Sequence, residues 1–104
     1  MTFDIMGINP LNENGRYLSF NNVSWHPVWT ELCRYTPELT DKDRETGSMN
    51  DGLLIEGSKH FGIIRALNKM VSSGVNRYGI DEITWSNLKL ILTFCESNEG
   101  FRIW

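Results

Sequence analysis

Hydrophobic and polar residues alternate along two short segments at opposite ends of the sequence. In residues Thr2–Ile8, Phe3 and Ile5 fall on one side and Asp4 falls on the other. A period of two is typical of a strand with one buried face. The segment Phe101–Trp104 alternates in the same way. We therefore expect the two segments to pair with each other in a sheet.

A turn and a second short strand are predicted directly after the first strand. Asn9-Pro10 ends the first strand, and the mostly polar segment Leu11–Arg16 is typical of a loop or hairpin turn. Tyr17–Phe20 is the second predicted strand. Asn21-Asn22 ends it, because asparagine tolerates left-handed backbone and bonds its own main chain.

Two helices are predicted where apolar residues recur every three or four positions. The first includes Trp25, has Pro27 in its first turn and ends at Thr36-Pro37, because the residue before a proline is driven out of helical geometry. The second spans Ser58–Ser73, and Gly74 stands where a C-terminal cap belongs.

A third helix is predicted after Val75–Thr84, a segment that mixes turn residues with isoleucines. Ser86 is the expected N-cap, with Trp85 and Leu90 placed to form a hydrophobic staple around it. The apolar stripe then continues to the turn residues that begin at Asn98.

The segment Glu38–Asp51 is polar and charged, with one leucine and one methionine in its fourteen residues. It is longer than the usual connection between elements, and such loops tend to be mobile or to serve binding. We expect an exposed surface loop with at most a short helical turn.

The order of these elements predicts an α+β fold. The terminal strands pair in a small antiparallel sheet, and about three helices pack on one face of it. A chain of 104 residues is long enough to bury a core, so we expect a single domain, 1–104. The two ends of this domain should lie side by side.

Charge and hydropathy exclude several classes of partner. The formal net charge is -3, and the basic residues are scattered singly, so duplex nucleic acid is not an expected partner. No apolar run approaches the ~18 to 20 residues of a membrane span, and the N-terminal residues lack the pattern of a signal peptide. We expect a cytoplasmic protein that does not bind membranes.

Only two cysteines are present, Cys33 and Cys95, and each falls in the apolar stripe of a predicted helix. Buried, reduced thiols are therefore expected rather than a disulfide. With His26 and His60 they supply too few ligands for a convincing metal site. No metal and no cofactor is predicted.

The segment Gly15–Trp29, GRYLSFNNVSWHPVW, resembles the string G-x-Y-F-R-N-N-V-W-W-W-R-P-L-W of a family of small bacterial and phage proteins. Three other family segments have counterparts here. The segment G-x-N-P corresponds to Gly7–Pro10, D-G-L to Asp51–Leu53, and the terminal G-F-x-I-aromatic to Gly100–Trp104. The resemblance therefore spans most of the chain.

The chain departs from this family pattern at three positions. Ser19 and Ser24 stand where the family more often has an aromatic or basic residue, and His26 replaces the basic residue before the proline. The resemblance implies an origin in bacteria or their phages, and a location in the host cytoplasm if the protein is phage-encoded. It names no chemistry.

Aromatic and amide side chains concentrate in the segment from Tyr17 to Trp29. Such groups bind a flat ring ligand by stacking and a few hydrogen bonds, or anchor a protein interface. Burying all of them requires partners for two indole N–H groups and a phenol hydroxyl, so part of the cluster should lie at a wet edge. The alternative is that these side chains form the core between helix and sheet. The candidate ligand-binding residues are Tyr17, Asn21, Asn22, Trp25, His26 and Trp29.

No motif places a nucleophile beside a base, so catalysis is the least favoured function. The adjacent carboxylates of Asp81-Glu82 point apart on any regular element, which is typical of a solvated loop. His60, beside Phe61, is interpreted as a boundary residue.

Three functions remain open. The first is a non-enzymatic binding protein for a nucleotide-like small molecule, phage-encoded and sequestering a molecule of a host signalling or defence pathway. The second is an inhibitor or adaptor acting on a host protein, with the acidic segment Glu38–Asp51 engaging a basic surface. The third is a small hydrolase or transferase. Self-association into a homo-oligomer is also left open.

Overall fold

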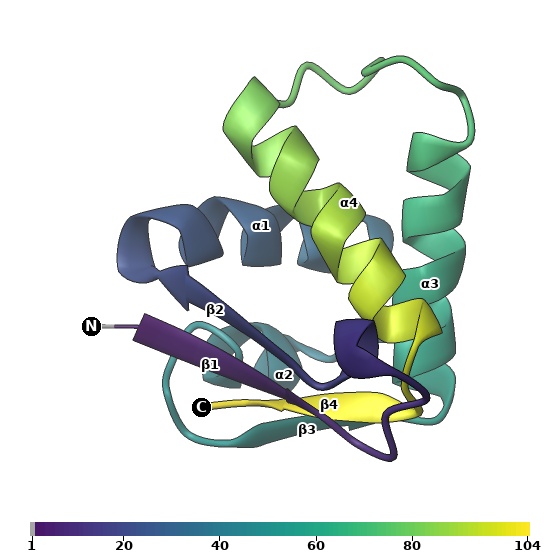
Figure 1. The fold of residues 1–104 in the computed structure, drawn as a ribbon. Helices are drawn as coiled ribbons and strands as arrows, with labels where there is room; N and C mark the ends of the chain where they lie inside the picture. The colour runs from purple at the N-terminus through teal and green to yellow at the C-terminus, as the bar shows by residue number, and fades with distance from the viewer. Residues whose placement is uncertain (1) are drawn as a thin grey trace.

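The computed structural model describes residues 2–104 and has an α+β fold in two layers, a sheet and a helical layer (Figure 1). The sheet is four-stranded and antiparallel, with strand order β2-β1-β4-β3. The strands are β1 (Thr2–Gly7), β2 (Tyr17–Asn21), β3 (Leu53–Glu56) and β4 (Gly100–Ile103). The helices are α1 (Asn22–Tyr35), α2 (Asp41–Thr46), α3 (Ser58–Val71) and α4 (Glu82–Glu96), and a 3-10 turn, η1, spans Glu13–Gly15.

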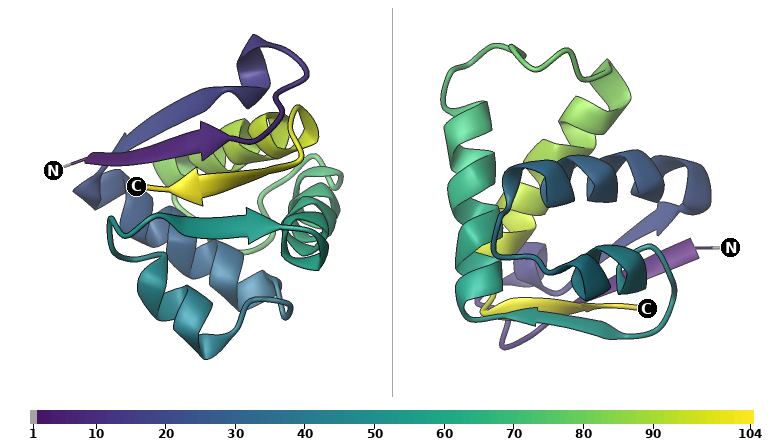
Figure 2. Two further views of the ribbon diagram at one scale, coloured as in Figure 1. Left: turned by 90° about the horizontal axis from the view of Figure 1, so that it is seen from below. Right: turned by 180° about the vertical axis from the view of Figure 1, so that it is seen from behind.

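The first and last strands of the described chain lie side by side in the middle of the sheet, which confirms the predicted pairing. Ile5 pairs with Ile103, and both side chains are fully buried. Beyond this pairing, Asp4 and Trp104 exchange two main-chain hydrogen bonds, of 3.0 and 2.9 Å. The two ends of the described chain are therefore close together, as Figure 2 also shows.

Strand β3 was not expected. Leu53–Glu56 lies just before the second predicted helix and pairs with β4 over its whole length, with Ile55 opposite Phe101. Gly52 and Gly57 bound the strand, and both have a positive φ, of 78° and 58°. Glycine adopts this backbone without the steric cost of a Cβ atom, so the chain can enter and leave a four-residue strand sharply.

Helix α1 begins earlier than predicted. Its N-cap is Asn21, whose side-chain oxygen accepts a hydrogen bond of 2.8 Å from Ser24 N–H. Pro27 therefore lies inside the helix rather than in its first turn. Because proline has no N–H, the carbonyl of Val23 lacks its helical donor. Val23 is highly exposed, so water can take that place. The predicted end of the helix, before Thr36-Pro37, is confirmed.

The polar segment 38–51 is anchored rather than freely exposed, contrary to the prediction. It contains helix α2, whose N-cap, Thr40, forms a capping box with Asp43. Leu39 and Asp43 are buried, and Asp43 forms an ion pair with Lys59 at 2.8 Å. Burial acts to raise the pKa of Asp43, but hydrogen bonds from Lys59 and Thr40 outweigh it and hold this pKa below its ordinary value.

Helix α4 begins five residues before the predicted start. Its N-cap is Asp81, which accepts hydrogen bonds from Thr84 N–H and Thr84 Oγ1 at 2.9 and 2.8 Å. These hydrogen bonds hold the pKa of Asp81 below its ordinary value. The predicted cap at Ser86 and the staple with Leu90 are wrong, because Ser86 lies inside the helix and Leu90 is half exposed. Asp81 therefore caps the helix and Glu82 lies in its first turn, so neither belongs to the solvated loop that was predicted.

The core lies between the helices and the inner face of the sheet. Helix α3 has the predicted start at Ser58 and packs beside α4, and apolar residues of both helices join residues of the strands in one buried cluster. Cys33 and Cys95 are buried and free, as expected. Burial raises the pKa of the Cys33 thiol to about 11 and raises the pKa of Cys95 further, so both are poor nucleophiles at neutral pH.

Candidate functional site

Trp25 and Trp29 are core residues. Trp25 is fully buried and Trp29 is 3% exposed. Their rings stack with centroids 5.7 Å apart, and Trp25 also stacks on Phe3 at 5.7 Å. The structure therefore places both tryptophans according to the core alternative.

The indole N–H groups of the two tryptophans are satisfied without water. Trp25 Nε1 donates to the carbonyl of Gly47 at 2.8 Å, and Trp29 Nε1 donates to the carbonyl of Arg44 at 2.9 Å. Gly47 itself packs against the Trp29 ring, since a Cβ there would lie 2.1 Å from a ring carbon. These carbonyls lie at the end of α2. The polar segment 38–51 therefore supplies the hydrogen-bond acceptors that were expected to come from water at an exposed edge.

The other four candidate residues lie in different places. Tyr17 is on the face of the sheet that no helix covers and donates to Asp4 Oδ1 at 2.6 Å. Asn21 caps α1. Asn22 and His26 lie one turn apart on the exposed side of α1, with Asn22 Oδ1 3.0 Å from His26 Nε2. The predicted cluster is therefore divided among three surroundings and does not form one face.

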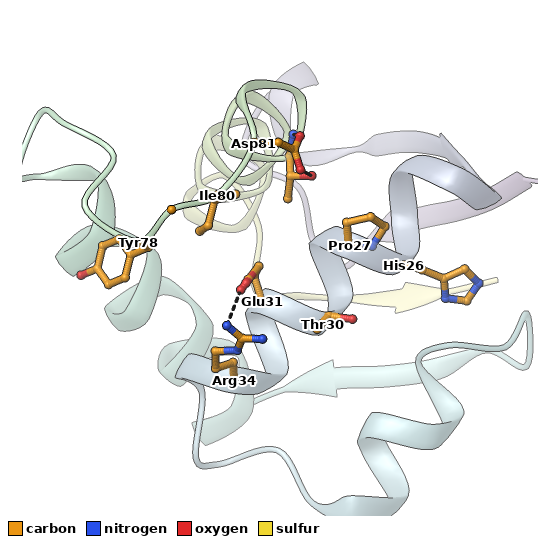
Figure 3. A pocket seen from close by; sticks show the side chains of 10 residues that line it. His26, Pro27, Thr30, Glu31, Arg34, Tyr78, Ile80 and Asp81 are labelled. Atoms are coloured by element: carbon orange, nitrogen blue, oxygen red, sulfur yellow. Dashed lines mark hydrogen bonds and ion pairs between the residues drawn. The ribbon is translucent and has the colours of Figure 1, made fainter.

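A cleft of about 500 Å³ lies between α1 and the segment that leads into α4, and His26 is the one predicted residue that lines it. Figure 3 shows the lining side chains on its two walls, α1 and the segment before α4, with Glu31 and Arg34 pointing toward each other. A volume of this size is within the range of small-molecule sites, about 300 to 1,000 Å³. The lining residues are His26, Pro27, Thr30, Glu31, Arg34, Tyr78, Gly79, Ile80, Asp81 and Thr84.

One wall of the cleft is a stripe along α1. His26, Thr30 and Arg34 follow one another at intervals of four residues, which places them on the same face of the helix. Glu31 lies beside them, is only 9% exposed and pairs with Arg34 at 3.4 Å (Figure 3). This wall therefore presents a basic group at each end and an almost enclosed carboxylate near the middle.

The opposite wall is held by its own hydrogen bonds. Asn76 accepts from Tyr78 N–H at 3.2 Å, and its side-chain amide donates to the Ile80 carbonyl. The Tyr78 ring packs edge-on against Tyr35, with centroids 5.2 Å apart. Gly79 has a φ of 67°, which lets the chain turn between the tyrosine and Ile80. An aromatic ring is thereby fixed at the rim of the cleft.

Chemically, the cleft is suited to binding. Arg34 and His26 can bind anionic groups, Glu31 and Asp81 can accept hydrogen bonds from N–H or hydroxyl groups, and Tyr78 offers a ring edge. Thr84 Oγ1 already donates to Asp81, so it is held in a helix cap. The arrangement brings together polar groups of both signs around a space.

Sequence reasoning missed the rest of the cleft. The stripe of Thr30, Glu31 and Arg34 could have been recognised as the polar face opposite the tryptophans, at helical spacing. The wall that contains Tyr78 and Ile80 had no local signal, because its place depends on how α4 crosses α1.

His60 is buried rather than a boundary residue. It is 7% exposed, and its Nε2 lies 3.0 Å from Asn98 Oδ1. Asn98 also accepts from Gly100 N–H and donates to the Gly15 carbonyl, each at 3.1 Å. The histidine therefore orders the turn that leads into β4. His60 also lines a second cleft, of about 310 Å³, between the start of α3 and the end of α4.

Protonation of His60 should make the stability of the fold depend on pH. Burial lowers the pKa of His60 below its ordinary value of 6.5, so the unfolded chain binds this proton more readily than the folded chain. The free energy of unfolding should therefore be greatest above pH 6.5 and should fall as the pH drops below it. Urea midpoints measured between pH 7 and pH 5 report this loss.

Carboxylates contribute to the pH dependence of the free energy of unfolding at lower pH than His60 does. Hydrogen bonds from Arg65 lower the pKa of Glu38 to about 2 from 4.5, so its contribution is lost only below pH 4.5. The variant His60→Gln should lose most of the dependence between pH 7 and pH 5, whereas His26→Gln, which keeps His60, should retain it. If the urea midpoint changed equally between pH 7 and pH 5 in wild type and His60→Gln, the assignment of this pH dependence to His60 would be wrong.

Two further properties bear on the site. Within residues 2–104, no cluster of three or more histidine, cysteine, aspartate or glutamate side chains has the proximity needed to hold a metal ion. None of the helices in the same range has the length and apolar character to span a bilayer.

Comparison with known proteins adds no family and no relative. No family model, curated protein or solved structure matches the chain. The resemblance to small bacterial and phage proteins therefore stays a prediction, and the candidate site rests on the geometry of the cleft.

Proposed function

We propose that this protein is a non-enzymatic binding protein and that its ligand occupies the cleft between α1 and α4. The observation that carries the proposal is the position of Glu31. Its carboxylate is almost enclosed, yet its one ion pair is with Arg34 at 3.4 Å, on the same helix. A carboxylate and a guanidinium held together at the wall of a 500 Å³ space can each turn hydrogen bonds toward a bound molecule.

The lining chemistry favours a small molecule with a ring and an anionic group, such as a nucleotide. Arg34 and His26 can bind phosphate oxygens, and Glu31 and Asp81 can accept from base or sugar donors. The Tyr78 ring provides an aromatic contact at the rim. Binding without turnover would sequester the molecule. That role suits a phage-encoded protein acting against a host signalling or defence pathway, in the host cytoplasm.

A thermal-shift screen of nucleotides and cyclic nucleotides tests this proposal. A ligand at 100 times its dissociation constant stabilises the fold by about 2.7 kcal/mol. For a domain of this size, that corresponds to a rise of roughly 10 °C or more in the melting temperature. Arg34→Gln removes the guanidinium and Glu31→Gln removes the carboxylate, and each should weaken binding about tenfold or more, because both lose a charged hydrogen bond.

Arg16→Gln is the matched control. Arg16 also forms an exposed pair with a glutamate three residues away, Glu13, but lies outside the cleft. This variant should bind as the wild type does. Ligand-induced shifts that are equal in wild type, Arg34→Gln and Glu31→Gln would place binding elsewhere. No shift with any nucleotide would refute the nucleotide proposal.

A further inference from the structure

One face of the sheet is covered by no helix. Figure 1 shows the helices on one side of the strands, and the left view of Figure 2 looks onto the other side. Antiparallel sheets with one solvated face normally present polar side chains there. Beside polar residues such as Asp4, Ser19 and Arg102, this face also carries Met6, Tyr17 and Trp104, which are 43%, 48% and 48% exposed, and the partly buried Leu54.

A row of paired residues crosses all four strands of this face, and its member on β4 is an arginine, Arg102. Met6 pairs with Tyr17 on β2 and with Arg102 on β4, and Arg102 pairs with Leu54 on β3. The Trp104 ring lies against Gly52, where a Cβ would stand 2.6 Å from a ring carbon. The face therefore presents a fixed tryptophan, a tyrosine and an arginine, which are the residues most enriched at the energetic centres of protein interfaces.

This face carries charges of both signs, so it is complementary to the same face of a second copy. Arg102 donates to the Gly52 carbonyl at 2.9 Å and has no carboxylate within 4.0 Å among residues 2–104. Asp4 accepts hydrogen bonds from the neutral hydroxyls of Tyr17 and Ser19. One face thus offers a cation without a carboxylate and a carboxylate without a cation. Phosphates would meet a single arginine beside Asp4 and Glu56, which disfavours single-stranded nucleic acid.

We propose that this face docks a second copy of the chain in a two-fold dimer, with Arg102 of each copy paired to Asp4 of the other. A two-fold axis along the strands, between β1 and β4, places β1 of one copy over β4 of the other. Arg102 then lies opposite Met6 of the second copy, and Asp4 lies two residues farther along the same strand, about 6.6 to 6.8 Å away along the face. The long arginine side chain and the shorter aspartate side chain reach toward each other across the gap between the sheets. The two sheets pack as an aligned sandwich, ~10 Å apart.

The area of the face sets the expected affinity of the dimer. Four strands ~4.8 Å apart and about five residues at ~3.3 Å each give a footprint of roughly 300 Å² per copy. A standard interface buries ~800 Å² per partner, so this dimer is weak and reversible. It forms as concentration rises and does not require the cleft to be occupied.

Sedimentation of the purified chain, from micromolar to about millimolar concentration, tests the dimer. The weight-average mass of the wild type should rise from that of a monomer toward twice that value. Self-association should weaken at least about tenfold in each of the variants Asp4→Arg and Arg102→Glu. In either variant, residue 102 of one copy would meet residue 4 of the other copy with a charge of the same sign. Mixed in equal amounts, the two variants should associate about as well as the wild type, since the mixed dimer contains two opposite-charge pairs.

Glu96→Arg and Arg77→Glu are the controls, because they make the same charge changes away from this face and should leave self-association unchanged. Circular dichroism shows whether each variant is folded before it is compared. A wild type that stays monomeric throughout, or a mixture that associates no better than the single variants, overturns the proposal. A monomer that binds a single-stranded oligonucleotide through Tyr17 and Trp104 would also overturn it, and would assign the face to nucleic acid.

Discussion

Trp25→Ala should lower the free energy of unfolding by about 3 to 5 kcal/mol. The indole is fully buried, stacks between Phe3 and Trp29, and its N–H is the donor to the Gly47 carbonyl. Alanine would leave a large cavity and an unpaired carbonyl in the core. At roughly 4 to 8 °C per kcal/mol for a domain of this size, thermal denaturation should shift by more than 10 °C.

Trp104→Ala is the matched comparison, because it deletes the same atoms from a side chain that is 48% exposed. Its cost should be about 1 kcal/mol or less, as for most surface substitutions. Equal losses from the two variants would contradict the division into a core tryptophan and a surface tryptophan. A small loss from Trp25→Ala would return Trp25 to the set of candidate ligand-binding residues.

Deletion of residues 101–104 should abolish cooperative folding. Strand β4 lies between β1 and β3, so its loss leaves both without a partner on that side. It also removes Phe101 and Ile103, which are fully buried. The burial of these two side chains alone is worth about 3 to 6 kcal/mol, a large share of the 5 to 15 kcal/mol that a domain commonly has.

Far-UV circular dichroism with a thermal scan reports the outcome of this deletion. The truncated protein should show no sigmoidal transition, whereas deletion of Trp104 alone should leave the fold intact with a lower melting temperature. A truncated protein that melts cooperatively at the wild-type temperature would show that the pairing of β1 with β4 is wrong.

Elements whose signals lie within their own residues were predictable. The alternation of Phe3 and Ile5 predicts β1, and the periodicity after Ser58 predicts α3. The pairing of β1 with β4 followed because two apolar strands at opposite ends each required a partner. The fold class could therefore be predicted without knowledge of the packing.

Elements defined by contacts with distant residues were not predictable. Strand β3 is four residues long and becomes a strand by pairing with β4, almost fifty residues later in the sequence. Helix α4 has two plausible caps, and packing decides between them: Thr84 is buried, and its N–H and hydroxyl bond to Asp81. The short helix α2 is held in place by the tryptophans of α1 rather than by its own apolar residues.

The candidate site was predicted only in part, for the same reason. His26 lines the cleft, but Trp25 and Trp29 find their N–H acceptors 22 and 15 residues later, in a segment with no apolar pattern. Local composition could show that the indoles needed acceptors, and it could not show where these were. The helical spacing of Glu31 and Arg34 places them on the polar face of α1, but such residues are common on helices, and nothing in the sequence shows that this face lines a cleft.

The position of β4 in the chain has a consequence for folding during synthesis. Strand β4, one of the two central strands of the sheet, is translated after every other described element, and both of its neighbours are made earlier. At about 5 to 20 residues per second, roughly 2 to 9 s separate the completion of β3 from the start of β4 on the ribosome. Through that interval β1 and β3 lack their shared partner, and each exposes a strand edge that a neighbouring nascent chain could pair with. The helices can form as they leave the tunnel, but the sheet closes in a single late step, when Phe101 and Ile103 insert between strands that are already present.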